Sequence, residues 1–359
     1  MKDSITETTH IRCARAPLAG ALTFVMVLVS QAAMADEAGV SFWLPGFFGS
    51  LAAAPQQPGW SLADIYYHDH VSAGGDVTLA REFEIGKVPV GFSGTLSGSV
   101  KVPNLDIDLL ALSYVSATPV LGGQLAVGMM GFWGRNNTTL SATLNGTITP
   151  PGTSFTRSDF ISDTLWGFGD LFPLASLRWN QGVNNWMVYM TGDIPVGAYQ
   201  STRLANMGIG HGAIDGGVGY TYLNQQTGHE FSAVLGFTGN FENTATNYTN
   251  GVDMHLDWGA SQFLSKQILV GPVGYVYQEI GCDSGSGDHV GCFRSRVIGI
   301  GPQVGYIFPM GTQLQGYLNL KAYGEFDNAH RADGWNLWLT FAISPAAAPP
   351  PPSMRMVTK

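Results

Sequence analysis

The sequence has little charge, few cysteines and almost no long hydrophobic runs. Charged residues make up 12% of its 359 positions, against about 25% in a typical soluble domain. The mean hydropathy is nevertheless only +0.09. One stretch alone, at the N-terminus, approaches the roughly 20 apolar residues that a membrane-spanning helix needs. Low charge without long apolar runs indicates strands that are apolar on one face, which is typical of a membrane β-barrel.

Other absences narrow the function. The formal net charge of -9 argues against nucleic acid as a partner. There is no Gly-x-Ser-x-Gly nucleophile elbow and no phosphate-binding P-loop. We therefore interpret the 47 glycines as positions where tilted strands bend or crowd. The sequence predicts a protein that is not an enzyme, binds no cofactor or metal, and has no nucleotide-driven energy source.

Residues 1–35 are predicted to be a secretory signal peptide. They have a basic start, an apolar core over 18–29 and a small-x-small cleavage site ending at Ala35. The alternative is an uncleaved membrane anchor, although the apolar core is short for one. Export would place the mature chain in an oxidising compartment.

Two cysteines remain in the mature chain, Cys282 and Cys292, at the ends of a loop rich in glycine, serine and aspartate. In an exported protein this arrangement favours a local disulfide. A metal site that also uses Asp288 and His289 is the alternative, but the spacing matches no common zinc pattern.

From about residue 105 onward, segments of ten to fourteen residues alternate between polar and apolar side chains. Residues 313–326 are the clearest case, and such alternation is typical of strands with one wet and one apolar face. The breaks between segments are alternately short and long, as in outer-membrane barrels. We predict an all-β, antiparallel transmembrane barrel over 60–344, with about 12 strands and long extracellular loops, one of them at 135–168.

Three parts of the chain do not follow this pattern simply. Residues 75–102 could be an external loop, an extension of neighbouring strands, or an extra hairpin that would give 14 strands. Residues 36–59 lack alternation and are predicted to be a plug inside the lumen. Residues 345–359 form a proline-rich tail, predicted to be disordered because proline lacks the N–H that a sheet requires.

Polar and ionisable residues on two predicted strands are candidates for lining the lumen or contacting ligand. On the lipid side, such charges would cost about 2–4 kcal/mol each near the midplane, so we expect them to face inward. His255 and Asp257 could pair by a hydrogen bond, and Lys321 could pair with Glu325. A polar network, ligand contact, and catalysis or metal binding remain as alternatives. The candidates are Asp253, His255, Asp257, Lys321, Tyr323 and Glu325.

Arg331 and Asp333 lie in a polar break at 327–334. We predict that this pair anchors the loop against the barrel wall.

Several motifs resemble a family named for the meta-cleavage pathway of phenol degradation. They include GFGDL at 167–171, GDIPVGAY at 192–199, and the long runs at 203–224, 231–265 and 319–344. The resemblance implies an outer-membrane barrel associated with catabolism of aromatic compounds, similar in plan to long-chain fatty-acid and toluene channels. This chain departs from the family in having Ile-Pro-Val-Gly where a Leu-Pro-Thr-Gly-like turn is usual, and in its two loop cysteines.

Together these observations predict a channel in the outer membrane of a Gram-negative bacterium. It would contact outer-membrane lipid and allow passive uptake of small hydrophobic or aromatic compounds. The alternatives are a structural or surface-interaction barrel without transport and, third, a barrel enzyme.

Overall fold

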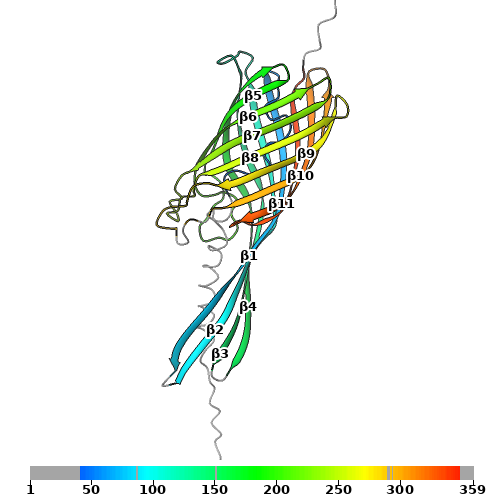
Figure 1. The fold of residues 1–359 in the computed structure, drawn as a ribbon. Coiled ribbons are helices and arrows are strands. Elements are labelled where there is room, and N and C mark those ends of the chain that lie inside the picture. Colours follow the sequence, from blue (N-terminus) through cyan, green and yellow to red (C-terminus); the bar gives the residue numbers. More distant parts are fainter. Residues whose placement is uncertain (1–40, 86–87, 150–151, 289–291, 293, 348–359) are drawn as a thin grey trace, which may run out of the picture.

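The computed structural model describes residues 41–85, 88–149, 152–288, 292 and 294–347 (Figure 1). The predicted signal peptide and most of the predicted tail lie outside these residues. Within them, no helix is long and apolar enough to cross a membrane.

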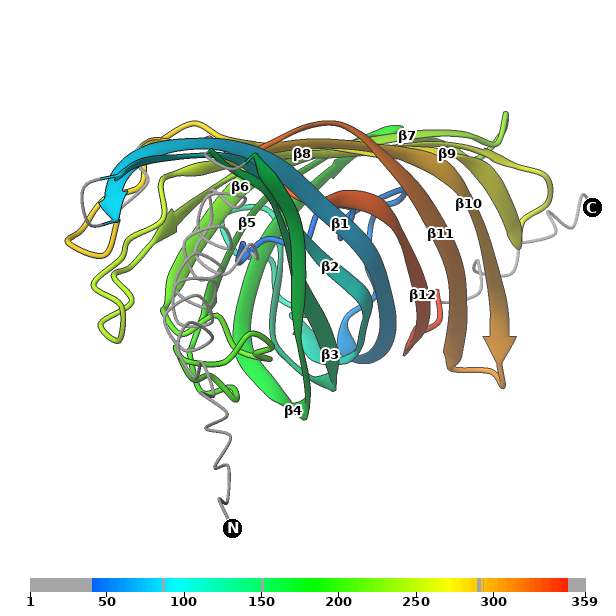
Figure 2. The same ribbon diagram turned by 90° about the horizontal axis from the view of Figure 1, so that it is seen from below.

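Twelve strands form one closed antiparallel barrel, in which each strand pairs with its neighbours in sequence and β12 pairs with β1. Figure 2 shows the curved wall that they form. The predicted 12-strand barrel is confirmed, and the alternative of 14 strands is wrong. The strands are β1 (Gly59–Ile85), β2 (Val88–Val115), β3 (Gln124–Thr149), β4 (Thr153–Gln181), β5 (Asn184–Asp193), β6 (Ala213–Asn224), β7 (His229–Asn240), β8 (Asp253–Phe263), β9 (Ile268–Glu279), β10 (Arg296–Met310), β11 (Leu314–Ala329) and β12 (Asp333–Pro345).

The two ends of the barrel differ in their connections. At the end where β1 begins and β12 finishes, which we call the short-turn end, the links span 116–123, 182–183, 225–228, 264–267 and 311–313. At the opposite end, the long-loop end, three links are long, 194–212, 241–252 and 280–295, whereas the β11–β12 link is short, at 330–332, because the strands continue into the polar break predicted at 327–334. This sorting of short and long connections is the one expected of an outer-membrane barrel.

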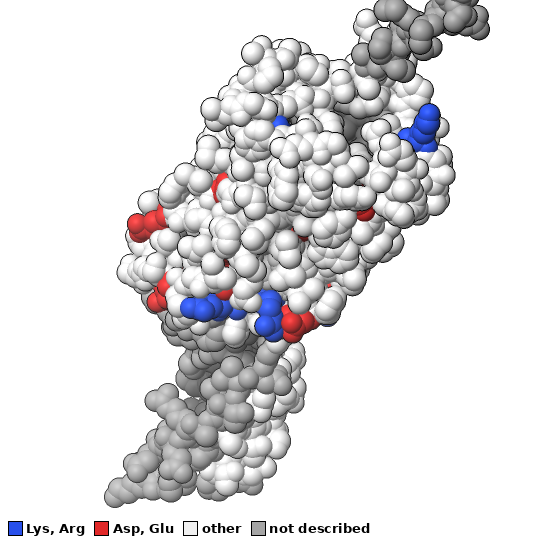
Figure 3. All heavy atoms as spheres, turned by 45° about the horizontal axis from the view of Figure 1, so that its top comes forward, with Lys and Arg blue, Asp and Glu red and all other residues white. Residues whose placement is uncertain are grey.

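Alternation along the strands separates an apolar outside from a mixed inside. In β5, Trp186, Val188 and Met190 are exposed, whereas Met187 and Tyr189 between them are buried. Few charged atoms appear on the barrel wall in Figure 3, where they gather toward the lower rim. A wall of exposed large apolar side chains requires an apolar surrounding.

Aromatic pairs lie on the outer surface near both ends of the barrel. Trp60, at the start of β1, is 64% exposed, and its ring lies 5.1 Å from that of Tyr114. Nearer the long-loop end, Trp133 is 43% exposed and lies 5.2 Å from Trp166. Trp338, in contrast, is buried inside, with its ring against Tyr67.

Strands β1 to β4 continue beyond the barrel as a four-stranded sheet, which projects downward in Figure 1. We call residues 73–85, 88–101, 138–149 and 153–165 the extension. The predicted loop at 135–168 is therefore wrong, and residues 75–102 extend neighbouring strands. Cross-strand hydroxyl pairs join the strands, for example Ser99 to Ser141 at 2.8 Å and Thr143 to Ser158 at 2.9 Å. Such pairs stabilise a sheet, but their polarity resembles a loop in the sequence.

The barrel ends one residue later than predicted. Pro345, the first residue of the predicted tail, lies opposite Leu314 as the last residue of β12. The missing proline N–H is tolerated at this position because the next residue, Ala346, donates its N–H to Gln313 O at 2.8 Å.

Candidate functional site

Residues 41–58 precede β1 and run inside the barrel without regular strand or helix (Figure 2). We call them the inner segment; residues 36–40 of the predicted plug lie outside the described part of the chain. Phe42, Trp43 and Ala53 in this segment are buried. Gly46 has a φ of +86°, and an added Cβ would lie 2.9 Å from the Tyr323 ring, so glycine is needed there for both conformation and space.

Two opposite charges from different strands hold the inner segment. Asp257 on β8 accepts hydrogen bonds from the N–H groups of Gly46 at 2.9 Å and Phe48 at 3.2 Å. Lys321 on β11 donates to the carbonyl oxygens of Gly46, Phe47 and Phe48 at 2.6, 3.0 and 3.3 Å. Hydrogen bonds to ionised groups are roughly twice as strong as neutral ones. We call Asp257 and Lys321 the clamp.

His255, on the same inward face as Asp257, belongs to a different buried network. Its Nε2 lies 2.9 Å from Asp215 Oδ2 and 3.2 Å from Tyr189 Oη. Its ring is stacked on Trp43, with centroids 3.6 Å apart and an interplanar angle of 13°. The suggested hydrogen bond between His255 and Asp257 is therefore wrong. His255 bonds instead to Asp215 on β6, two strands away, and Asp257 accepts its hydrogen bonds from the inner segment.

The other inward candidates on these strands are separately engaged. Asn240 donates to Asp253 Oδ2 at 3.1 Å. Tyr323 packs against Tyr275 with ring centroids 4.9 Å apart, and the Tyr275 hydroxyl donates to Glu325 at 2.6 Å. No ion pair joins Lys321 to Glu325 among the described residues. That suggested pairing is wrong because Lys321 turns to the backbone of the inner segment.

Arg331 and Asp333 do not bond to each other as a pair. Arg331 donates to Ser41 Oγ at 3.2 Å, and its guanidinium lies 4.3 Å from the centre of the Tyr277 ring. Asp333 accepts a hydrogen bond from Asn328 at 3.1 Å. Arg331 thus connects the β11–β12 loop to the inner segment as well as to the wall, and Asp333 holds the loop itself.

Cys282 and Cys292 form a disulfide in the β9–β10 loop, with Cα atoms 4.8 Å apart. Among the described residues, no group of three or more His, Cys, Asp or Glu side chains could hold a metal ion. The disulfide thus closes a loop at the long-loop end.

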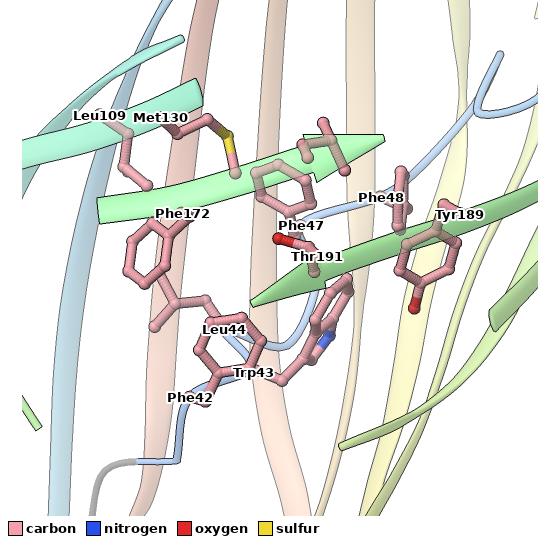
Figure 4. A pocket seen from close by; sticks show the side chains of 11 residues that line it. Phe42, Trp43, Leu44, Phe47, Phe48, Leu109, Met130, Phe172, Tyr189 and Thr191 are labelled. Atoms are coloured by element: carbon pink, nitrogen blue, oxygen red, sulfur yellow. The ribbon is translucent and has the colours of Figure 1, made fainter. Parts of the chain in front are cut away.

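Aromatic and aliphatic side chains enclose a small cavity of about 40 Å³ between the inner segment and the wall (Figure 4). We call it the aromatic pocket. In Figure 4, rings of the inner segment face Phe172 and Tyr189 on the strands. It is lined by Phe42, Trp43, Leu44, Phe47, Phe48, Leu109, Met130, Phe172, Leu174, Tyr189 and Thr191.

A larger cavity of about 500 Å³, which we call the vestibule, lies toward the long-loop end. Phe42, Leu44 and Phe172 line both cavities, so the two adjoin. Its size falls in the usual range for small-molecule sites, about 300–1,000 Å³. Apolar residues such as Phe132 and Ile107 line it together with a few ionisable ones.

The loop at 194–212 borders the vestibule and is fixed at two points. Asp170 accepts hydrogen bonds from the N–H groups of Gly197 at 2.7 Å and Ile209 at 2.9 Å. Farther out, Arg203 donates to Asp163 on the extension at 2.7 Å. The Arg203 hydrogen bonds hold the pKa of the Asp163 carboxyl below its usual range, against a smaller opposing effect of burial.

Sequence reasoning missed Asp170, Asp193, Tyr189 and Asp215 as residues of the interior. Asp170 and Asp193 do occur in two of the family-like motifs, GFGDL and GDIPVGAY. These motifs could have drawn attention to them: Asp193 is the last residue of β5, and Asp170 lies within β4 beside the start of the following loop, where Leu171 pairs with Ile194.

Comparison with known proteins agrees with this architecture. Residues 93–341 match a family described as putative MetA-pathway of phenol degradation. The solved structure of a COG4313 outer membrane channel from Pseudomonas putida F1 is similar, with a TM-score of 0.51 and 13% identity over 82% of this chain and 98% of that one. A FadL homologue from Pseudomonas aeruginosa has a TM-score of 0.37 and 10% identity, covering 88% and 97%. No curated protein matches the sequence. Since the family match covers more than half of the chain, this protein belongs to the family of the putative MetA-pathway of phenol degradation.

Proposed function

We propose that this protein is a channel in the outer membrane of a Gram-negative bacterium, for passive uptake of small hydrophobic or aromatic compounds. The observation that carries the proposal is the vestibule, which leads from the long-loop end to a pocket lined by aromatic rings. A largely apolar cavity with a few polar groups is the usual form of a small-molecule site. The proposal includes no catalytic step.

The outer surface supports a membrane position. Exposed aromatic pairs near both ends correspond to the girdles that mark the two interfaces of membrane barrels. Because periplasmic turns are short in such barrels, the short-turn end would face the periplasm. The vestibule would then open toward the cell exterior.

The inner segment would control passage. It lies across the lumen on the short-turn side of the vestibule and is held by the clamp, Asp257 and Lys321. A solute that reaches the aromatic pocket must displace part of this segment or leave sideways through the wall. Movement would follow the concentration gradient of the solute.

Single-channel conductance of the refolded protein in a planar bilayer tests this proposal. We expect a small steady conductance that toluene or phenol reduces at millimolar or lower concentration, because these solutes would occupy the aromatic pocket. Glycerol at the same concentration is the control and should have no such effect. A conductance that responds equally to toluene and glycerol contradicts a specific apolar site in the lumen.

A second candidate function is surface interaction, and the extension favours it. Its four strands project from the long-loop end, and the hydroxyl pairs of Ser99, Ser141, Thr143 and Ser158 lie on one face. A variant with the extension replaced by tight turns should keep the response to toluene if the protein is a channel. The surface function is supported by two results together. Cells with this variant would lose adhesion, and cells without the gene would take up aromatic compounds at the normal rate.

A further inference from the structure

Asp193 is a buried carboxylate without a hydrogen-bond partner among the described residues. It ends β5 on the inward face, following Tyr189 and Thr191 at every second position. Its side chain borders the vestibule, and the residue is only 7% exposed. Neither carboxylate oxygen accepts a hydrogen bond. Asp170, on the neighbouring strand, uses its own carboxylate for the 194–212 loop.

No described cation neutralises this carboxylate. Of the two guanidinium groups that line the vestibule, Arg203 pairs with Asp163 and Arg331 stacks on Tyr277. Four carboxyl groups and two guanidinium groups thus line the cavity. The ionisable residues of its lining are Asp69, Asp170, Asp193, Glu325, Arg203 and Arg331.

A buried carboxylate without a partner costs stability. Buried polar groups in native proteins are nearly always hydrogen-bonded, so an exception points to a role outside the fold itself. Since Asp193 faces a cavity of about 500 Å³, the missing partner is expected to be a group of a ligand that donates hydrogen bonds or carries positive charge.

A divalent metal ion fits this position poorly. Calcium takes six to eight oxygen ligands and magnesium requires an octahedral set. The Asp170 oxygens already accept backbone N–H groups, and no metal-binding cluster occurs among the described residues. A primary ammonium group has three donors and a single charge, which one free carboxylate can bind.

The surroundings of Asp193 also select what the ammonium group is attached to. Thr191, two residues earlier on the same face, lines the aromatic pocket, and this spacing corresponds to roughly 7 Å along a strand. Phe172 lines both the pocket and the vestibule. A ligand with its charge at Asp193 would thus have its apolar part among the rings.

We propose that Asp193 binds the ammonium group of an amphiphilic primary amine whose apolar part lies in the vestibule, against the rings of Phe42, Phe132 and Phe172 at its border with the aromatic pocket. This inference rests on the proposed function, since it uses the same vestibule, and it names amines with an aliphatic or aromatic body as a substrate class.

Binding of three solutes of equal chain length tests the proposal: octylamine, 1-octanol and octanoate. Binding is measured by calorimetry on the full-length barrel in lipid nanodiscs, and differences between variants in identical discs remove partitioning into lipid. Asp193→Asn removes the charge with almost no change in shape. Asp159→Asn makes the same change at an exposed position of the extension and is the matched control.

We expect octylamine to bind at least about tenfold more weakly to Asp193→Asn than to the unmodified protein or the control, because a charge-assisted contact contributes about that much. Octanol should bind all three equally, and octanoate should bind least. Equal binding of octylamine to both variants overturns the inference but leaves uptake of apolar solutes standing. Failure of octanol and octylamine alike to bind contradicts the proposed function as well.

Two further measurements keep the result interpretable. Calcium that competes with octylamine, and does so only when Asp193 is present, would identify a metal site and overturn the proposal. The urea midpoint of Asp193→Asn should equal or exceed that of the unmodified protein, because an unpaired buried charge is removed. A lower midpoint would show that Asp193 has a structural partner instead.

Discussion

Replacing Lys321 by methionine should loosen the inner segment. The Lys321 ammonium group donates to three backbone oxygens of that segment, at 2.6 to 3.3 Å. Methionine keeps much of the length and has no donor. A hydrogen bond to a charged group contributes about 1.5–3 kcal/mol, and all three bonds are made by the one ammonium group. Since these contributions overlap, we take about 3 kcal/mol as the loss in seating free energy.

A loss of about 3 kcal/mol raises the population of the released segment on the order of 100-fold. Ser50→Cys places a thiol on the segment, and its labelling by a maleimide reports that population when reclosing is fast. We expect labelling on the order of 100-fold faster in Lys321→Met. Lys266→Met, at an exposed turn position, is the control and should label at the rate of the Ser50→Cys parent.

The opposite perturbation is also available. Ser50 Oγ lies 2.7 Å from Ser261 Oγ, so a double cysteine variant at these positions should lock the segment when oxidised. Conductance should fall on oxidation and recover on reduction.

If Lys321→Met and Lys266→Met label within about twofold of each other, Lys321 does not hold the segment and the reasoning about the clamp is refuted.

Three other predictions concern parts of the molecule that support the site. Trp43→Ala removes the ring stacked on His255 and should lower the free energy of unfolding by about 3–5 kcal/mol in urea titration; Trp258→Ala on the outer wall is the comparison, and an equal loss would contradict a special role for the buried ring. Gly236→Ala places a methyl group against Tyr189 Oη and His255 Nε2, so we expect about 1–3 kcal/mol of destabilisation; an unchanged urea midpoint would show that the network yields. The pKa of Asp163 is lowered in the folded protein, so its stabilisation of the 194–212 loop is present above the ordinary aspartate pKa and is lost as pH falls through the lowered value; hydrogen exchange of this loop should accelerate in acid, and Asp163→Asn should show fast exchange at neutral pH, whereas pH-independent exchange would argue against the Arg203 contact.

The barrel was predictable because its physical cause is local. Alternation of side chains over 313–326 is enough to identify β11, and the sorting of short and long breaks fixes the antiparallel order. Residues 36–59 show no alternation, which excludes a barrel strand there but does not by itself place them; the structure has residues 41–58 inside the barrel. For residues 75–102 an extension of neighbouring strands was one of three alternatives, whereas the part at 138–165 was taken for a loop. The reason is that Ser and Thr at every second position satisfy one another across strands, and in the sequence this composition resembles a polar loop.

Inward orientation follows from period two, but the partner of each inward side chain does not. The bond between His255 and Asp215 depends on the strand register. The bonds of Lys321 depend on the inner segment, which is more than 200 residues away in the sequence. Asp193 could be placed at a strand end from the sequence, yet its lack of a partner is a property of the folded interior alone.

Initial uptake of radiolabelled naphthalene by intact cells tests the central claim most directly. The comparison is between cells that contain the protein, cells from which its gene is deleted, and deleted cells that receive it again, with labelled glycerol as the hydrophilic control. The account predicts that deletion lowers naphthalene uptake several-fold, that complementation restores it, and that glycerol uptake does not change. Equal naphthalene uptake in all three strains would contradict a role in passing apolar solutes across the outer membrane.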